Sequence, residues 1–584
     1  MNLPLSRCAR VALLIAGAAM VGAPCRSQCG IVADLTSGTA NNTNIGEITS
    51  AFGQELYFTF FDSAVSHTRL WKWTESGGAF EVAAGASYRN PESLTPCVTS
   101  SGPTVFYRAW EAGKGFELHC SDGTAQGTGM VRDIEPGSGN SLPVDLVASG
   151  NKVFFNARTS GFGEELWVSD GTTAGTERLS DFAPGSAHGR PNDIFAFNGK
   201  VLFSAYDPAV GRELFVSDGT VQGTLLLADI EVGVTASSPA EFTRLGEFVY
   251  FTAQTSTHGL EVWRTNGTAA GTIRITNAFV APAFGPTELT ACGDLLFFHN
   301  ITGSGYGELY VSDGSVGSAI NLGVLATDLA CSGSTLFFRG SGVAGYELWI
   351  SDGTALGTQQ LLDMVPNGSG FPSDFIDCGA GVCFVANTAV HGELWFSDGT
   401  AAGTSNVCTL DPGGNAGISL MTMCRGRLFM NAYDPNYGRE LIGIATPGAS
   451  TASLGGASAP DYPRLRVAGG AVPILGSSVD LEGFGPAGHA AIVLGGMSGL
   501  PSPWLSIPGI IEGAADWVGL LGGTAVTIST QSTTHFTVPF ALPNNAALEG
   551  HAFHFQTIWV NPTASPFLQA SNGLQLALGV SAPH

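Results

Sequence analysis

Lysine is nearly absent from this chain of 584 residues, and charged residues of all kinds make up only 12% of it. The four lysines all lie within the first 200 positions, no basic run occurs, and the formal net charge is −24. A surface of that sign repels phosphate backbones and anionic lipid. The composition therefore disfavours nucleic acid and membrane surfaces as partners, and it favours cations or neutral polymers.

The sequence also lacks the common signatures of catalysis and metal binding. No G-x-S-x-G, H-E-x-x-H or Walker loop occurs in the context that it requires, and no cysteine or histidine spacing argues for zinc. His551 and His554 are three residues apart on an expected strand, so they face opposite sides and share a metal poorly. We predict no catalytic residue and no metal site, which leaves enzymatic activity open but favours its absence.

Long hydrophobic runs are missing except near the N-terminus. The apolar run Val11 to Val21 follows Arg7 and Arg10 and is followed by small residues up to Ala23. It is too short to span a bilayer and is typical of a secretory signal. We predict a signal peptide at residues 1–27, no membrane span, and an exported protein that is secreted or held at the cell surface.

What the sequence has in abundance is a repeat. The stretch E-L-W-V-S-D-G-T-T-A-G-T from Glu165 recurs, nearly intact or looser, at steps of 39 to 48 residues. Copies begin at Glu117, Glu165, Glu213, Glu261, Glu308, Glu347 and Glu393. Degenerate copies at Arg69 and Glu440 bring the number of units to nine. A period in this range, with several short strands per copy, is typical of a repeat architecture.

Each unit contains four strand-like pieces, one of which carries an apolar triplet such as Val153-Phe154-Phe155. Consecutive apolar residues require that both faces of a strand be covered. Four short antiparallel strands repeated around a centre describe a β-propeller blade. We therefore predict an all-β fold, a β-propeller of nine four-stranded blades over residues 28–446. Eight blades are the alternative, because the 39-residue step can contain an irregular unit, and a β-solenoid is the second architecture.

The order of the pieces predicts how the ring closes. Ile31 to Leu35 matches the second piece of a unit, and Glu440 to Ala445 matches a first piece. We expect these two segments to meet in one composite blade. When a blade is counted from the E-L-W strand, its first strand is C-terminal and its other three strands are N-terminal.

The remainder of the chain has a different composition. Residues 447–460 are rich in Gly, Ala, Ser and Pro, which is typical of a linker. Residues 461–584 contain alternating segments separated by turn residues, and we predict a C-terminal β-sandwich there.

The motif G-x-E-L-W-x-S-D-G-T-x-x-G-T, followed by L-x-D-I, P-G-S and L-F-F, resembles the ELWxxDGT repeat family of secreted bacterial proteins over residues 31–446. The resemblance implies an extracellular repeat protein with a propeller fold, and it implies no particular activity. The C-terminal region is similar to a β-rich module that ends many exported proteins of large-genome bacteria.

The recurring acids have an expected structural role. The turn aspartates are Asp122, Asp170, Asp218, Asp313, Asp352 and Asp398. An Asp in D-G-T accepts hydrogen bonds from its own turn, and one carboxylate per turn is too few for a calcium loop. We predict no cofactor, with Ca²⁺ as the alternative. The recurring Glu at the start of each E-L-W strand is expected to bond backbone N–H groups of the neighbouring blade.

Residues that break the repeat are the better candidates for ligand binding. Trp73, Trp110, Glu111 and His119 occur in the first two units, and aromatic rings beside polar groups stack on sugars or anchor protein partners. The sequence therefore favours a monomeric, non-enzymatic propeller that binds an extracellular polymer or protein. The alternatives are a carbohydrate-active hydrolase or lyase with its site in the propeller funnel, and a ring that acts only as a spacer.

Export to an oxidising compartment predicts disulfides among the ten cysteines that follow the signal peptide. The candidate pairs are Cys378 with Cys383, Cys408 with Cys424, Cys97 with Cys120, Cys292 with Cys331, and Cys25 with Cys29.

Overall fold

The computed structural model describes residues 29–33, 35, 44–62, 65–83, 87–277, 285–301, 307–343, 345–366, 368–387, 392–411 and 414–445, together with seven strands between residues 464 and 577. The predicted signal peptide, residues 1–27, and the predicted linker, residues 447–460, lie outside the described residues. Among the described residues, no helix is long and apolar enough to cross a membrane.

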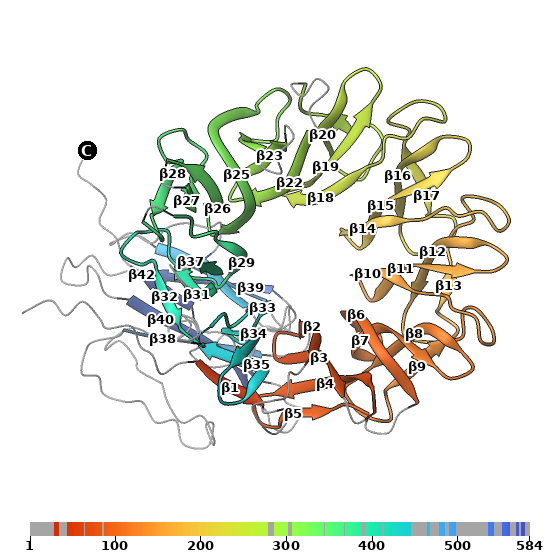
Figure 1. Ribbon diagram of the computed structural model, residues 1–584, viewed down its shortest axis with the longest axis horizontal. Helices are drawn as coiled ribbons and strands as arrows, with labels where there is room; N and C mark the ends of the chain where they lie inside the picture. The colour runs from red at the N-terminus through yellow and green to blue at the C-terminus, as the bar shows by residue number, and fades with distance from the viewer. Residues whose placement is uncertain are drawn as a thin grey trace, which may run out of the picture.

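Short antiparallel strands form sheets that stand around a common centre (Figure 1). Sheet 1 contains β2 (Asn44–Ala51), β3 (Glu55–Asp62), β4 (His67–Thr74) and β5 (Gly78–Glu81). Sheet 2 contains β6 (Tyr88–Thr99), β7 (Gly102–Glu111), β8 (Gly115–Ser121) and β9 (Gly129–Arg132). Sheet 3 contains β10 (Val144–Ser149), β11 (Lys152–Thr159), β12 (Gly163–Ser169) and β13 (Glu177–Arg178). Sheet 4 contains β14 (Asn192–Phe197), β15 (Lys200–Asp207), β16 (Gly211–Ser217) and β17 (Leu225–Ala228).

The second half of the ring continues in the same way. Sheet 5 contains β18 (Ala240–Leu245), β19 (Phe248–Thr255), β20 (Gly259–Thr265) and β21 (Ile273–Arg274). The double sheet contains β22 (Gly285–Cys292), β23 (Leu295–Ile301), β24 (Gly307–Ser312), β25 (Ile320–Ser332), β26 (Thr335–Gly342), β27 (Gly345–Ser351) and β28 (Gln359–Leu362). Sheet 6 contains β29 (Ser373–Asp377), β30 (Val382–Asn387), β31 (Gly392–Ser397) and β32 (Ser405–Cys408). The closing sheet contains β33 (Ser419–Cys424), β34 (Arg427–Asp434), β35 (Gly438–Ala445) and β1 (Cys29–Ala33).

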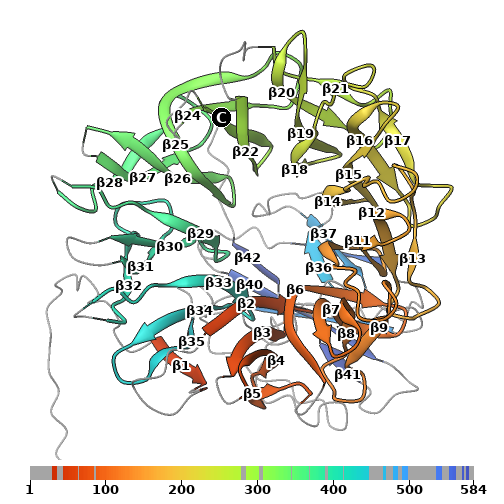
Figure 2. The same cartoon turned by 45° about the vertical axis from the view of Figure 1, so that its right-hand side comes forward.

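The first strand of each sheet is the innermost, and neighbouring first strands contact one another around the ring (Figure 2). The second strand carries the apolar triplet, whose side chains are buried on both faces. In sheet 3, Phe154 packs with Phe203 of sheet 4, whereas Phe155 packs with Phe106 of sheet 2. The predicted coverage of both faces is therefore confirmed, because each sheet is enclosed by its two neighbours.

The short 39-residue step corresponds to the double sheet. The first part of β25 pairs with β24, and its second part pairs with β26. One continuous strand of 13 residues thus replaces the outer strand, the loop and the inner strand that separate other sheets. The shorter step removes the loop and leaves the antiparallel order intact.

The two ends of the repeat region meet as predicted, because Ile31 of β1 pairs with Ile442 of β35. The predicted division of this sheet is wrong, however: three strands are C-terminal and one is N-terminal. Each sheet starts with the inner strand and not with the E-L-W strand, since the chain crosses to the next sheet after the outermost strand. The buried Glu440 accepts a hydrogen bond from the Leu35 N–H at 3.0 Å, which fastens this end of the chain.

The C-terminal strands form two further sheets. One has the order β36 (Arg464–Val467), β37 (Ser478–Phe484) and β39 (His535–Ala541). In the other, β40 (Ala552–Val560) pairs with β38 (Ala490–Met497), β41 (Leu568–Ala570) and β42 (Leu574–Ala577). These sheets are antiparallel, and the predicted sandwich stays a prediction.

A Glu440→Gln substitution should weaken ring closure. The amide of the new side chain brings an N–H donor close to the Leu35 N–H, which donates to the Glu440 carboxylate in the wild type. An unmade buried hydrogen bond costs about 1–3 kcal/mol. Urea unfolding should show that loss, whereas Glu308→Gln, at the equivalent but exposed position, should change stability by less than about 0.5 kcal/mol. Equal losses in the two variants would contradict this account of closure.

Candidate functional site

The repeated turns use their aspartates internally. Asp170 Oδ1 accepts hydrogen bonds from the backbone N–H of Thr172 at 2.9 Å and from its hydroxyl at 2.7 Å. The Gly175 N–H donates to that same hydroxyl at 2.9 Å. The same bonds to the aspartate recur at Asp122, Asp218, Asp313, Asp352 and Asp398, and at Asn266 in the T-N-G-T copy. The turn motif is therefore a closed hydrogen-bonded unit that explains why both Asp and Thr recur.

Both glycines of the turn are required by geometry. Gly171 has a φ of 92°, which L-residues rarely adopt. A Cβ on Gly175 would lie 2.1 Å from Asp170 Oδ1, so only glycine fits there. The sequence D-G-T-x-x-G-T thus describes one rigid turn, in which the carboxylate has a structural role.

The recurring Glu is buried and holds the connection that leads to the next sheet. Glu165 accepts hydrogen bonds from the Ser180 hydroxyl at 2.7 Å, from the Phe182 N–H at 3.1 Å and from the Gly189 N–H at 3.2 Å. Glu117, Glu213 and Glu347 bond the corresponding connections in the same way. Glu393 is only half-buried and accepts hydrogen bonds from the side chains of Asn406 and Thr409. Glu308 is exposed, because the continuous strand β25 replaces the connection that a buried carboxylate would hold.

Burial opposes the charge on these glutamates. Burial raises the pKa of Glu117 to about 7, against hydrogen bonds from Ser141 and the backbone that lower it. Burial likewise raises the pKa of Glu165, Glu213 and Glu347. In contrast, the Ser315 hydroxyl lowers the pKa of the exposed Asp313 to about 2. The pKa of these four glutamates is therefore raised, whereas the pKa of Asp313 is lowered.

The four sequence-predicted ligand residues lie in three different places. Trp73 is 5% exposed, and its ring is 4.7 Å from that of Phe429 in the closing sheet. It fills the space between the closing sheet and sheet 1, so its predicted role as an exposed platform is wrong. The structural reason is that Trp73 lies where other repeats have a small residue such as Ser169, and the neighbouring sheet covers it.

Trp110 and Glu111 are consecutive on β7, so they face opposite sides of sheet 2. Trp110 is half-buried, pairs across the hairpin with Phe116, and has the Arg89 guanidinium 5.1 Å from its ring centre. Glu111 is on the other side and accepts a hydrogen bond from the Ser87 hydroxyl at 2.9 Å. The alternation of side chains along a strand therefore divides the predicted set.

His119 is fully buried and takes the position that Trp167 has in sheet 3. Its ring stacks on Tyr107, and its Nε2 is 3.7 Å from Glu111 Oε2. Burial lowers the pKa of His119, which keeps the ring neutral. His119 and Glu111 do lie together, but as a contact between neighbouring strands of sheet 2.

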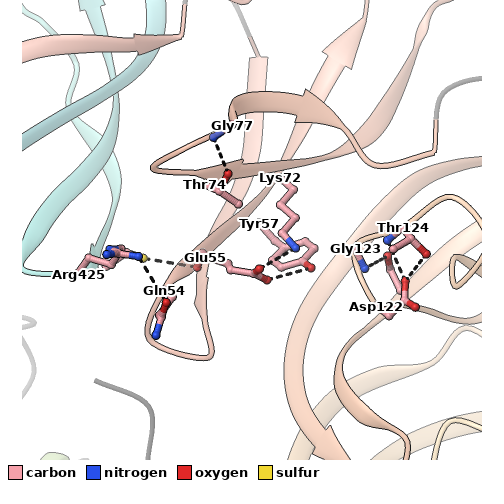
Figure 3. A network of polar contacts seen from close by, with 12 residues as sticks. Gln54, Glu55, Tyr57, Lys72, Thr74, Gly77, Asp122, Gly123, Thr124 and Arg425 are labelled. Atoms are coloured by element: carbon pink, nitrogen blue, oxygen red, sulfur yellow. Dashed lines mark hydrogen bonds and ion pairs between the residues drawn. The ribbon is translucent and has the colours of Figure 1, made fainter. Parts of the chain in front are cut away.

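Polar contacts gather around sheet 1 where the ring closes (Figure 3). The Lys72 ammonium is 2.8 Å from Glu55 Oε1 and 5.3 Å from the centre of the Tyr57 ring. A Cβ on Gly123, in the repeated turn of sheet 2, would lie 2.5 Å from the Lys72 nitrogen. On the other side, the guanidinium of Arg425 in the closing sheet is 2.9 Å from Glu75. An ion pair therefore joins sheet 1 to the closing sheet, and the Lys72 side chain lies close to the repeated turn of sheet 2.

One recurring aromatic position was recognised in the sequence only at Trp110. It lies near the end of the second strand of a sheet. Its residue forms the next-to-last pair before the turn that leads to the third strand. Phe61, Trp110 and Tyr433 take this position in sheet 1, sheet 2 and the closing sheet, which are adjacent. We call these three residues the aromatic arc. The signal was readable as an aromatic residue that precedes an acid at the end of the strand, in F-D, W-E and Y-D.

A set of carboxylates on the innermost strands was also missed. Its members are Glu47, Asp145, Asp193, Glu241, Glu288, Asp328 and Asp374, and we call them the inner acidic ring. All but Glu47 have a positive φ between 53° and 60°, in β-bulges that shift the register of the inner strand. From Asp145 onward, an acid followed by an apolar residue at a 40- to 48-residue spacing was the available signal.

Only part of the predicted disulfide pattern is present. Cys292 and Cys331 form a disulfide, as predicted. Cys408 is disulfide-bonded whereas Cys424 has a free thiol, so that predicted pair is wrong. Cys97 and Cys120 are also free thiols. They lie on β6 and β8 with β7 between them, so two strand spacings of about 4.8 Å separate them, beyond the reach of about 7 Å for a disulfide.

The remaining two cysteine pairs have different outcomes. Cys378 and Cys383 are free thiols, and the hydrogen bond to Cys378 together with burial raises the pKa of Cys383. They lie side by side as expected for a cross-strand pair but are not bonded. Cys25 and the side chain of Cys29 lie outside the described part of the chain.

Comparison with known protein families and with curated proteins finds no match to this sequence. Several solved structures are similar in fold. A puromycin-hydrolyzing peptidase of Mycobacterium tuberculosis has 15% identity and a TM-score of 0.33, over 64% of this chain and 59% of that one. Dipeptidyl peptidase 4 of Porphyromonas gingivalis has 10% identity and a TM-score of 0.38, over 68% and 65%. An uncharacterized protein of Listeria monocytogenes has 11% identity and a TM-score of 0.31, over 63% and 96%.

This chain therefore spans less than two thirds of the length of either peptidase. The TM-scores are low, so these likenesses carry no functional argument. The assignment of the architecture depends on the sheets themselves, which are antiparallel, four-stranded apart from the seven-stranded double sheet, and arranged in a ring that the two chain ends close. The repeat region is a β-propeller. The resemblance to the ELWxxDGT family stays a prediction.

A Gly175→Ala substitution should destabilise the propeller by about 1–3 kcal/mol, because its Cβ would overlap the Asp170 carboxylate. Gly161→Ala is the matched control, since a Cβ there meets nothing within 4 Å. The double variant Asp170→Ala with Gly175→Ala should cost less than the sum of the two single changes, as measured by urea unfolding. Strict additivity would contradict the proposed clash.

The stability difference between the wild type and Glu117→Gln should depend on pH. The folded-state pKa of Glu117 is raised to about 7 from its ordinary 4.5, so the folded protein binds this proton more tightly than the unfolded chain. The contribution of Glu117 is therefore fully present below pH 4.5 and is lost as the pH rises through 7. Unfolding free energies of both proteins at pH 4.5, 6 and 7.5 test this, and a difference that does not change with pH would oppose it.

Proposed function

We propose that this protein is an exported, non-enzymatic β-propeller of nine blades that serves as an extracellular binding or scaffold protein for a polymer or protein ligand. The double sheet counts as two blades that share β25, because the first part of β25 pairs with β24 and its second part pairs with β26. Export is supported by the signal-like N-terminus, and the net charge of −24 disfavours nucleic acid as the ligand.

The aromatic arc is the observation that carries the binding proposal. Phe61 is 39% exposed, whereas Phe58, three residues earlier on the same strand, is fully buried. Trp110 is half-buried, with Arg89 stacked on its ring. Tyr433 continues the same position into the closing sheet. Aromatic faces repeated at one level of three adjacent blades suit a ligand with a repeated apolar face, such as a neutral polysaccharide, or an extended protein segment.

The alternative is a carbohydrate-active hydrolase or lyase that uses carboxylates near the centre of the ring. Such an enzyme needs two carboxylates about 5–10 Å apart with different roles. The described acids on the innermost strands instead recur at one equivalent position in successive sheets. Recurrence favours a structural or binding role over catalysis, because an active site occurs once.

The C-terminal β-rich region fits an accessory or attachment module, by its similarity to modules that end other exported proteins. This role does not depend on the aromatic arc. We propose that the arc binds the ligand and that the C-terminal module positions the propeller.

The double variant Phe61→Ala with Trp110→Ala should lose at least about tenfold in affinity for a ligand identified by glycan array or pull-down with the full chain, because two aromatic contacts contribute about 1–3 kcal/mol together. Tyr206→Ala is the matched control. Tyr206 takes the equivalent strand position in sheet 4, is 41% exposed, and lies outside the arc.

Unchanged affinity of the double variant, or an equal loss in Tyr206→Ala, would overturn the assignment of the binding surface. Hydrolysis of a polysaccharide by the wild type, abolished by substitution of one inner carboxylate, would instead favour the enzymatic alternative.

A further inference from the structure

The inner acidic ring is divided by side-chain length. The longer Glu47 accepts hydrogen bonds from the Ser93 N–H at 2.8 Å and from the Leu94 N–H at 2.9 Å, both in the next inner strand. Glu241 accepts one from the Glu288 N–H at 2.9 Å in the same way. These glutamates therefore tie each inner strand to the following one.

Asp145 and Asp193 occupy the same position with a side chain one methylene shorter. Within the described inner strands, neither carboxylate accepts a hydrogen bond from the backbone of the next sheet. Asp193 accepts a hydrogen bond from the neighbouring Asn192 amide at 2.7 Å, and both aspartates are exposed residues at the second position of their strands. The aspartates thus keep ligand capacity that the glutamates use for the fold.

One position on the second strand faces these bulges. In sheet 1 it is Thr59, whose hydroxyl accepts the Glu47 N–H at 2.9 Å. In the double sheet it is Arg339, whose guanidinium is 2.5 Å from Asp328. The contacts to these two acids show that the side chain at this position is aimed at the bulge.

In sheets 3 and 4 the same position holds Asn156 and Ser204. They are 8% and 1% exposed, and Asn156 Oδ1 and Ser204 Oγ are buried without a hydrogen-bond partner among the described residues. A buried oxygen with no partner calls for a water or an ion beside it. Asn431 Oδ1 is also unpartnered at this position of the closing sheet, where the bulge residue is Leu420, so sheets 3 and 4 are the ones that combine such an oxygen with an unused aspartate.

We propose that Asp145 and Asp193, with Asn156 Oδ1 and Ser204 Oγ behind them, bind a hard divalent cation of the Ca²⁺ class. All four groups offer oxygen, which is the ligand that Ca²⁺ takes in proteins. A small ion reaches buried oxygens that a cationic polymer cannot. No group of three or more Asp, Glu, His or Cys side chains converges on one point in the described part of the chain, so water completes the coordination.

The surrounding charges agree with this site. The inner strands β10 and β14 that carry the two aspartates are in contact. Burial raises the pKa of Asp145, and burial followed by repulsion from Asp145 raises the pKa of Asp193. Arg212 is the cation near Asp193, and its guanidinium donates hydrogen bonds to the Arg190 carbonyl at 2.9 Å, to the Asn192 side-chain oxygen and to the Ser204 carbonyl at 3.4 Å. Asp145 has no ion pair among the described residues. A bound cation relieves this repulsion.

Isothermal titration of the full chain with CaCl₂ tests the proposal. A site with few protein ligands should bind with a dissociation constant of about 0.1–1 mM, as extracellular calcium modules do. Asp145→Asn with Asp193→Asn should weaken binding at least about tenfold, because a neutral amide replaces each carboxylate. The matched control is Asp170→Asn with Asp218→Asn, which changes two turn carboxylates in the same two sheets and should leave binding unchanged.

A second measurement keeps the test valid if the double variant folds poorly. Thermal unfolding of the wild type should shift upward with CaCl₂, and Asn156→Ala, which leaves both carboxylates in place, should reduce that shift. No binding at about 10 mM Ca²⁺, an unaltered affinity in the inner variant, or loss of binding in the turn variant would each overturn the site. Binding of an oligolysine peptide without binding of Ca²⁺ would overturn it in favour of a cationic polymer.

Discussion

The whole ring depends on one requirement: the second strand of every sheet is apolar on both faces and must be shielded on both. A single sheet cannot meet that requirement in water, and a stack of sheets leaves its two end sheets half-covered. Only a closed ring gives each sheet two neighbours. Phe154 and Phe155 show the consequence, since consecutive side chains of one strand are buried against different sheets. Closure by β1 is therefore part of the hydrophobic core and is more than a link between the chain ends.

The polar repeats follow from the same requirement. Sheets packed face to face leave the connections between them without regular backbone partners, and buried N–H groups must be satisfied. The recurring Glu supplies the acceptor from inside, and the D-G-T turn satisfies itself at the opposite end of the strand. Where the connection is absent, as in the double sheet, the carboxylate of Glu308 is exposed. The motif is thus a set of solutions to hydrogen bonding in the spaces that the core creates.

The sequence predicted the parts of this structure that repeat. Strand pieces, turn chemistry, the meeting of the chain ends and one disulfide were all readable, because each depends on local chemistry that occurs many times. The sequence predicted that each sheet starts at the E-L-W strand, which is the third strand of the sheet. The most regular stretch of the sequence is therefore not the first strand. The ligand residues were harder to predict. Trp73 breaks the repeat yet is covered by the closing sheet, and Trp110 and Glu111 are adjacent in sequence yet face opposite sides of a strand.

Position within the repeat, more than residue type, determines which side chains are free to act. On the inner strands, Glu47 reaches the next backbone and is consumed by the fold, whereas Asp145 stops one methylene short and keeps its oxygens available. On the second strand, Phe58 is buried, whereas Phe61, three residues later on the same strand, is exposed because it lies at the end of the hairpin. A repeat protein of this kind gains binding capacity by small departures at positions where the neighbouring sheet no longer covers the side chain. Any search for its ligands should therefore begin at the strand ends and the inner bulges, where substitution changes the surface without disturbing the packing between sheets.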